Sequence, residues 1–478
     1  MKYTIPNEII KLFNLDEEIS ADIIFVSPKK LICEDRLDII AKYIYLDLRY
    51  KCPEYAKSLY QEHIRVMTRG SFVEPYSEKK NIDTFFSSFE QVVTSIEQNG
   101  FDVGIAPIFV DETYKIIDGA HRVASCLFLN KDVPIVVLPI KGEYNIYNQA
   151  YFEHYGMDTN YLDLMMLYFL RLTEQEVYCL NVWPSAKNHD EELLKMIVDD
   201  FSVIYKKNVE LNENGAFLYL AQIYKEYAWA QEGDQNFSGV YRKLLPCFPD
   251  FSPIKTFFII PKKRIDLIDA KEKMRKIYNL EKNSLHMTDN KQETIQMAEI
   301  VLSSNTIDFL NNANVLKFKS TTKWIKEAQK IKEKRTEIVF CGSLVLALYG
   351  LREAHDIDYL CLEDDVESHN EYIDLYGMTL EDAIFNPQKH FCFFGIPFLT
   401  LECVRLFKTN RKEGKDIDDI KLIELFESGK MESKKTKYIQ IKRRIVGTIQ
   451  GKIIRILHLT GTFTIVRYVY RRIKGKKD

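Results

Sequence analysis

Residues 337–362 read EIVFCGSLVLALYGLREAHDIDYLCL, and this stretch decides how the C-terminal part of the chain is interpreted. The apolar run up to Cys341 predicts a buried strand, and Gly342-Ser343 predicts a turn into a short helix that ends near Gly350. Glycine allows close approach of the backbone, and free N–H groups at a helix start favour an anion such as a phosphate. The stretch therefore predicts a strand, a phosphate-binding turn and a helix.

Acidic residues follow this helix. Asp356 and Asp358 are two apart on a predicted strand, so we expect their carboxylates to share one face. Like charges on one face repel each other unless a cation lies between them, and such oxygen ligands suit Mg²⁺ carrying a nucleoside triphosphate. Glu402 is the one charged residue of a third predicted strand, residues 398–404, where a lone buried acid is costly unless it is paired or holds a metal. The basic residues just beyond it are available for phosphate: Lys408, Arg411, Lys412 and Lys415.

The order Gly-Ser, helix, Asp-x-Asp and a later third acid resembles the nucleotidyltransferase superfamily, and the stretch Lys415-Asp416-x-x-Asp419 is similar to that superfamily too. The resemblance covers about 95 residues. The resemblance implies that Asp356, Asp358 and Glu402 are catalytic metal ligands. It also implies that Gly342 and Ser343 form a turn that binds the triphosphate. The alternatives are a solvated aspartate pair with Glu402 in a structural ion pair, or the same fold with an inactive site.

A second motif, Asp118-Gly-Ala-His-Arg, follows a hydrophobic strand, and a helix is predicted to begin directly after Gly119. His121 and Arg122 would then lie in the first turn, where cations oppose the helix dipole, so local stability does not explain them. An anion held by both side chains and by free N–H groups would explain them, which again suggests a nucleotide phosphate. The alternative is that Asp118 and His121 cap a turn while Arg122 pairs with an acid.

This second motif resembles the ParB/sulfiredoxin fold, clearly over residues 105–138 and at most over residues 60–140. Members of that fold include nucleotide-dependent DNA clamps, reductases of sulfinic cysteines and kinases of small molecules. Reductase chemistry needs a cysteine where this chain has Ala120, and no helix-turn-helix region is recognisable. The resemblance therefore implies a small-molecule kinase that uses ATP or CTP, with Glu74 as its general base on position alone.

The charges are unevenly distributed. The 478 residues carry 66 Lys or Arg and 69 Asp or Glu, yet residues 434–478 contain eight Lys and six Arg against one Asp. The tail thus has a net charge of +13 and the preceding body −16, which predicts a separate partner for the tail. Its basic clusters alternate with aliphatic residues, so we expect an amphipathic helix on an anionic membrane surface. A nucleic-acid arm and a helix packed on the acidic body are the alternatives.

Composition excludes several classes of protein. A hydrophobic fraction of 46% with 28% charged residues excludes a disordered or collagen-like chain. The nine cysteines form no Cys-x-x-Cys pair, and there is no Walker loop and no Gly-x-Gly-x-x-Gly. No apolar window reaches the roughly 20 residues of a spanning helix. We therefore expect a cytoplasmic protein that associates peripherally with the inner face of the cell membrane.

These signals predict a multidomain protein of the α/β and α+β classes. Its expected parts are a ParB/sulfiredoxin-like domain over residues 1–145, an α/β middle domain of unknown role over 146–331, a nucleotidyltransferase-like domain over 332–430 and a basic amphipathic tail over 431–478. In the middle domain, strands are expected over 177–183 and 254–260 and helices over 191–201 and 214–230.

The expected function is a kinase of a sugar or polyol joined to a Mg²⁺-dependent nucleotidyltransferase, serving cell-surface polysaccharide precursors. One alternative is a nucleotidyltransferase of toxin or regulatory type that modifies a tRNA or a protein. Another is a ParB-like, nucleotide-dependent DNA-binding protein. Nucleic acid is the less favoured partner because the body of the chain is acidic.

Overall fold

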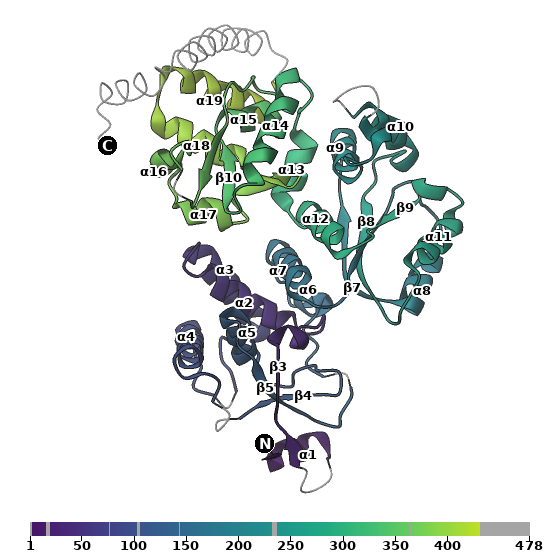
Figure 1. Ribbon diagram of the computed structural model, residues 1–478, viewed down its shortest axis with the longest axis vertical. Helices are drawn as coiled ribbons and strands as arrows, with labels where there is room; N and C mark the ends of the chain where they lie inside the picture. The colour runs from purple at the N-terminus through teal and green to yellow at the C-terminus, as the bar shows by residue number, and fades with distance from the viewer. Residues whose placement is uncertain are drawn as a thin grey trace. The chain divides into compact units, whose positions relative to one another are not determined.

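The chain forms two compact units in the computed structural model (Figure 1). The N-terminal unit comprises residues 1–223 and 240–307, and the C-terminal unit comprises residues 224–239 and those from 308 onwards. Both units mix helices with small sheets, as predicted for the fold class. The structure describes residues 2–15, 20–75, 77–102, 106–142, 144–231, 237–363 and 365–430.

A three-stranded sheet lies inside the predicted first segment. Its order is β3-β5-β4, with β5 antiparallel to β3 and parallel to β4. A separate antiparallel pair joins β1 to β2. The strands are β1 (Lys2–Thr4), β2 (Ser20–Asp22), β3 (Ile24–Val26), β4 (Ile108–Val110) and β5 (Val133–Val137). The helices are α1 (Asn7–Phe13), α2 (Leu37–Leu48), α3 (Pro53–Met67), α4 (Ile82–Asn99) and α5 (Ala120–Leu129).

Local interactions explain where the two helices beside the Asp118–Arg122 loop begin. α5 begins directly after Gly119, as predicted, and the φ of 89° at that residue belongs to the left-handed region that glycine readily adopts. α4 begins after Asn81, whose side chain accepts a hydrogen bond from the Thr84 N–H while Thr84 accepts one in return. Its buried face includes Phe89, whose ring contacts the ring of His121 edge-on at 4.7 Å. The loop is therefore fixed between two well-defined helices.

A four-stranded sheet lies inside the predicted middle segment. Its order is β7-β8-β6-β9, and all neighbouring strands are antiparallel. The strands are β6 (Tyr178–Val182), β7 (Phe201–Val209), β8 (Ile254–Pro261) and β9 (Leu285–Met287). The helices are α6 (Gln149–His154), α7 (Thr159–Leu172), α8 (Asp190–Asp200), α9 (Glu213–Ile223), α10 (Ser238–Cys247), α11 (Leu267–Tyr278) and α12 (Lys291–Val301). Strands β6 and β8 confirm the two predicted strands, whereas β7 was not predicted.

The sheet of the C-terminal unit has the order β11-β10-β13-β12. β10 runs antiparallel to β11 and parallel to β13, and β12 and β13 form a hairpin. The strands are β10 (Ile338–Cys341), β11 (Asp358–Cys361), β12 (His390–Phe393) and β13 (Ile396–Leu399). The helices are α14 (Lys319–Lys332), α15 (Ser343–Leu348), α16 (Ile373–Tyr376), α17 (Leu380–Phe385), α18 (Leu401–Arg411) and α19 (Gly414–Glu427). After the earlier segment 224–239, the chain returns to this unit within α13 (Ser304–Asn312).

The core of this unit fixes where its strands end. Val339, Cys341 and Leu360 are buried with Tyr376 and Phe407, whose rings stack 4.5 Å apart. The burial of this face of the strand pair therefore sets the β10–β11 register. The predicted strand up to Cys341 and the short helix after it are confirmed as β10 and α15.

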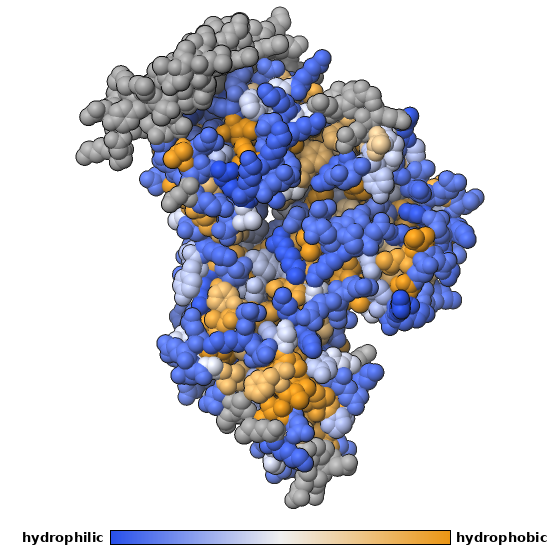
Figure 2. All heavy atoms as spheres, viewed as in Figure 1, coloured by the Kyte–Doolittle hydropathy of each residue, from blue (hydrophilic) through white to orange (hydrophobic). Residues whose placement is uncertain are grey.

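The surface is mostly hydrophilic on the face drawn in Figure 2, with hydrophobic residues in small groups. Exposed examples include Phe25 and Ile268. Among the described residues, we find no helix with the length and apolar character needed to cross a membrane. All nine cysteines carry thiols, and seven of them are buried.

Candidate functional site

The Gly-Ser turn and the aspartate pair lie together at one end of β10. In the β10–β11 ladder Cys341 is paired with Asp358, which places Gly342 beside that aspartate. The buried Ser343 hydroxyl donates a hydrogen bond of 2.9 Å to Asp356 Oδ1. The spacing of the motif therefore did predict which residues meet, although what they bind stays a prediction.

The geometry of the aspartate pair differs from the expectation. β11 begins at Asp358, so Asp356 precedes the strand and the predicted shared strand face is wrong. Asp356 is exposed, and its orientation comes from the hydroxyl of Ser343 at the start of α15. The two carboxylates are nevertheless close enough for the charge of Asp356 to raise the pKa of Asp358.

Gly342 is required by both its conformation and its surroundings. Its φ of 66° lies in the left-handed region, and a Cβ at this position would collide with the Asp358 carboxylate. The absence of a side chain thus lets the turn approach β11 closely.

The variant Gly342→Ala is expected to destabilise the C-terminal unit by about 1–3 kcal/mol, because it adds backbone strain and displaces the Asp358 carboxylate. Gly395→Ala is the matched control: Gly395 has a φ of 73°, but a Cβ added there would meet no atom of the described residues within 4 Å. Denaturant unfolding gives the free energy of unfolding of both variants. The control measures the cost of backbone strain alone, and the difference between the two variants measures the cost of the collision. An equal loss of stability in the two would contradict the close approach inferred for Gly342.

Asp358 occupies an unfavourable place for a negative charge. Its side chain is 22% exposed, and His369 Nε2 lies 3.6 Å from its Oδ1. Burial raises the pKa of the Asp358 carboxyl and the charge of Asp356 raises it further, while His369, Lys408 and Arg411 act in the opposite direction. His369 was not predicted to lie here, because it follows β11 without any recognisable motif.

Glu402 does not belong to this site. The predicted strand over residues 398–404 is wrong, because β13 ends at Leu399 and Glu402 lies exposed in the first turn of α18. Thr400 explains the change: its side chain accepts a hydrogen bond from the Cys403 N–H, as an N-cap does. Within the described part of the chain, no three His, Cys, Asp or Glu side chains gather as a metal site. The predicted three-acid set is therefore wrong.

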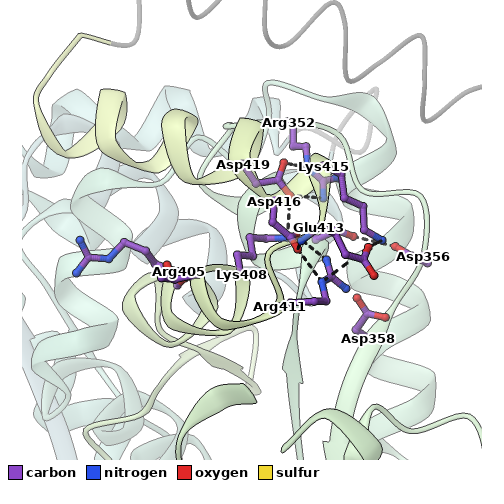
Figure 3. A network of polar contacts seen from close by, with 12 residues as sticks. Arg352, Asp356, Asp358, Arg405, Lys408, Arg411, Glu413, Lys415, Asp416 and Asp419 are labelled. Atoms are coloured by element: carbon purple, nitrogen blue, oxygen red, sulfur yellow. Dashed lines mark hydrogen bonds and ion pairs between the residues drawn. The ribbon is translucent and has the colours of Figure 1, made fainter. Parts of the chain in front are cut away.

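Lys408 is buried in an ion-pair network behind the site (Figure 3). Its side chain is 2% exposed, and its Nζ lies 2.7 Å from Asp419 and 3.4 Å from Asp416. Arg352 donates two hydrogen bonds, of 2.7 and 3.0 Å, to the same Asp419 carboxylate. The prediction that Lys408 binds phosphate is wrong, because its ammonium is buried and paired with two acids of α19.

Arg411 and Lys415 also have acidic partners. Arg411 donates two hydrogen bonds, of 2.8 and 2.6 Å, to Asp416, and Lys415 lies 3.1 Å from Glu413. Although burial raises the pKa of Asp416, the hydrogen bonds from Arg411 hold it below its usual value. Arg352 was not predicted as part of this network. The Lys415-Asp416-x-x-Asp419 stretch did indicate its two buried acids, Asp416 and Asp419.

The balance of charge around the aspartate pair fits a bound cation. The network contains four cations (Arg352, Lys408, Arg411 and Lys415) against five carboxylates (Asp356, Asp358, Glu413, Asp416 and Asp419), a net charge of −1 when all of them are ionised. Mg²⁺ is commonly held by one or two carboxylates together with substrate phosphates, so two ligands meet its needs without a third acid. The residues therefore fit Mg²⁺ that arrives with a nucleotide.

The second predicted site is arranged differently from the first. His121 Nε2 lies 2.9 Å from the Tyr60 hydroxyl, and Arg122 Nη1 donates a hydrogen bond of 2.7 Å to the Ala106 carbonyl. Burial lowers the pKa of His121 well below its usual value, so the ring is neutral. A Cβ on Gly119 would collide with Ile108, so this position requires a residue without a side chain.

The remaining predicted residues of the N-terminal loop give no further support to kinase chemistry. Asp118 is exposed, and Glu74 forms an ion pair of 2.8 Å with Lys79. Binding of a phosphate by Asp118, Gly119, His121 and Arg122, and the role of Glu74 as a general base, stay predictions. The tail over residues 434–478, with its expected membrane contact, lies outside the described residues.

Comparisons with protein-family models, with curated proteins and with solved structures found no match for this chain.

Proposed function

We propose that the C-terminal unit is a Mg²⁺-dependent nucleotidyltransferase. The observation that supports this best is the meeting of the Gly342-Ser343 turn with two carboxylates, through the Ser343–Asp356 hydrogen bond and the close approach of Gly342 to Asp358. This combination provides oxygen ligands for a divalent cation beside a turn without side-chain obstruction, which suits a triphosphate.

In this proposal Asp356 and Asp358 hold Mg²⁺, which supplies charge neutralisation to the reacting phosphates. An acceptor oxygen forms a bond to the α-phosphorus of the nucleotide, the bond from that phosphorus to the bridging oxygen breaks, and pyrophosphate leaves. Ser343 orients Asp356, and the buried network of Lys408, Asp416 and Asp419 fixes α18 against α19.

We propose a second activity for the N-terminal unit, as a kinase of a sugar or polyol that uses ATP or CTP. Its support is the loop in which Gly119 leaves room for Arg122, whose Nη2 would lie 2.9 Å from a Cβ on that glycine. His121 and Arg122 then stand in the first turn of α5, where a phosphate is a suitable anion. Together the two activities would make an activated precursor of a cell-surface polysaccharide.

Two labels on the same nucleotide test both halves of the proposal in the full-length chain. With Mg²⁺ and a panel of sugars and polyols, label on the α-phosphate should pass to a small product through the C-terminal unit. Label on the γ-phosphate should pass to a small product through the N-terminal unit. Both transfers should stop when the divalent cation is chelated, because the phosphates then lose their neutralising partner.

Two outcomes of this experiment would contradict the proposal. If α-label enters a protein or a tRNA instead, the acceptor is a macromolecule and the alternative of a modifying enzyme holds. If neither label is transferred and no nucleotide binds with Mg²⁺, both proposed activities are wrong.

A further inference from the structure

A buried set of ionic side chains lies beside the Asp118–Arg122 loop, and neither proposed activity uses it. Asp38, on α2, is 2% exposed and accepts hydrogen bonds of 2.8 and 3.0 Å from Arg36. The same carboxylate accepts a hydrogen bond of 3.1 Å from Lys42, and the Asp38 carbonyl accepts another of 3.2 Å. Arg36 and Lys42 are themselves only 3% and 4% exposed. Two buried cations therefore share one buried carboxylate.

With both side chains protonated, one positive charge has no buried counterion among the described residues, and burial lowers the pKa of the Lys42 ammonium accordingly. The charge of Lys79 also acts on Lys42, but Lys79 forms an ion pair of 2.8 Å with Glu74, so it adds no net charge. An unbalanced buried charge is costly, because the desolvation of an ion is recovered only through partners of opposite sign. The excess charge is thus a feature that a bound anion would stabilise.

His63, on α3, is the second and independent observation. Its ring is fully buried, and neither ring nitrogen has a hydrogen-bond partner among the residues that the structure describes. Burial lowers the pKa of His63 well below its usual value, and the charge of Lys42 lowers it further. The neutral ring therefore carries one N–H donor and one acceptor that are both unsatisfied, close enough to Lys42 and Asp38 to feel their charges.

The set reaches the surface through His121. Its Nε2 is hydrogen-bonded to the hydroxyl of Tyr60, one turn before His63 on α3. The centroid of the Tyr60 ring lies 6.1 Å from that of His63 and 6.3 Å from that of His121, so the loop and the buried set adjoin the same tyrosine. His121 is half-buried and Lys79 is 19% exposed, whereas His63 is fully enclosed.

We propose that Lys42, His63 and His121 form a binding site for an oxyanion, carried as a phosphate or a carboxylate group by a small molecule. Such a group accepts a charge-assisted hydrogen bond from Lys42 and one from the His63 N–H, and it balances the excess charge. This inference does not depend on the proposed nucleotidyl transfer, which belongs to the other unit. It shares His121 with the proposed phosphate-binding loop, but its centre is Lys42 and His63.

The test is a titration of the full-length protein with inorganic phosphate, with acetate and with glycerol, in the absence of Mg²⁺. The side-chain ¹⁵N resonances of histidine report the site, and His63→Phe identifies the His63 signals. We expect phosphate or acetate to shift the signals of both His63 and His121. A response to phosphate alone identifies a phosphoryl group, and a response to acetate alone identifies a carboxylate.

His63→Phe separates binding from a structural role. The ring lies among Tyr60 and Phe152, so phenylalanine suits these surroundings and removes two unsatisfied nitrogens. We expect a thermal midpoint equal to or above that of the unmodified protein, together with anion affinity at least tenfold weaker. Lys42→Met, which leaves Asp38 paired with Arg36, should lose affinity to the same extent and serves if the phenylalanine variant does not fold.

Lys271→Met is the matched control, because Lys271 is a buried lysine of the same unit that pairs with Asp289. Its anion affinity should be unchanged. Equal affinity in His63→Phe, Lys42→Met and the unmodified protein would overturn the proposal. So would a shift of the His121 signals alone, which places the anion on the loop, or an equal response to glycerol, which carries no charge.

Discussion

The double variant Asp356→Asn, Asp358→Asn is expected to lose Mg²⁺-dependent transfer of α-label while it stays folded. Neutral amides remove both charges that would hold the cation, so nucleotide affinity in the presence of Mg²⁺ should fall to that measured without the cation. The raised pKa of Asp358 means that its charged form is disfavoured in the folded protein. Removal of this charge should therefore not destabilise the unit, and denaturant unfolding of the variant checks that expectation.

Two comparisons make the result specific. Transfer of γ-label should continue in the double variant, because the proposed kinase lies in the other unit. Glu402→Gln should keep full transfer of α-label, because Glu402 is exposed on α18 and lies outside the site. Full α-label transfer by the double variant would remove Asp356 and Asp358 from the chemistry.

The centre of the candidate site could be predicted because its signals are local. An apolar strand, a glycine with a positive φ and a short apolar helix follow one another without interruption from Ile338 to Leu348. The antiparallel return of β11 then brings Asp358 beside Gly342. A spacing of a few residues thus determines most of the geometry, and the same holds for the start of α5 after Gly119.

The error at Glu402 has a physical cause. A short apolar run with β-branched and aromatic residues is compatible with either a strand or a buried helix, and periodicity alone does not distinguish them. Thr400 is the residue that favours the helix, because a threonine before such a run can cap it. The strand β7 was missed for a related reason, since it follows α8 without an intervening turn.

The ion-pair partners could not be predicted, because they depend on packing between distant parts of the sequence. Arg352 and Asp419 are 67 residues apart, and His121 meets Tyr60 across 61 residues. The excess charge near His63 is likewise invisible in the sequence, where Arg36, Asp38 and Lys42 look like an ordinary charged helix start. Burial makes the difference, because a charged side chain on the surface costs little free energy, whereas the same side chain in a core needs a partner of opposite charge.

The largest effect on stability is expected for Asp38→Asn. The substitution leaves Arg36 and Lys42 buried without their shared counterion, and the loss of one partner of a buried ion pair costs about 3–5 kcal/mol. Hydrogen exchange measured by mass spectrometry suits this test, because peptides from α2 and α5 should lose protection while peptides from the C-terminal unit act as an internal reference. Glu54→Gln, at an exposed ion pair on α3, is the matched control and should change little.

The pH dependence of stability gives an independent check on Asp38. Although burial raises the pKa of Asp38, the charges of Arg36 and Lys42 hold it far below its usual value. A depressed pKa in the folded state contributes stability above the unfolded pKa of about 4, and that contribution declines as the pH falls below this value. The asparagine variant should lack this acid-dependent part of its unfolding free energy.

The same variant links stability to the proposed oxyanion site. Without the Asp38 carboxylate the excess positive charge doubles, so inorganic phosphate should raise the thermal midpoint of Asp38→Asn by more than that of the unmodified protein. Glu54→Gln should respond to phosphate as the unmodified protein does. A loss of less than about 1 kcal/mol in Asp38→Asn without phosphate would contradict the buried ion triad, since a solvated pair contributes no more than that.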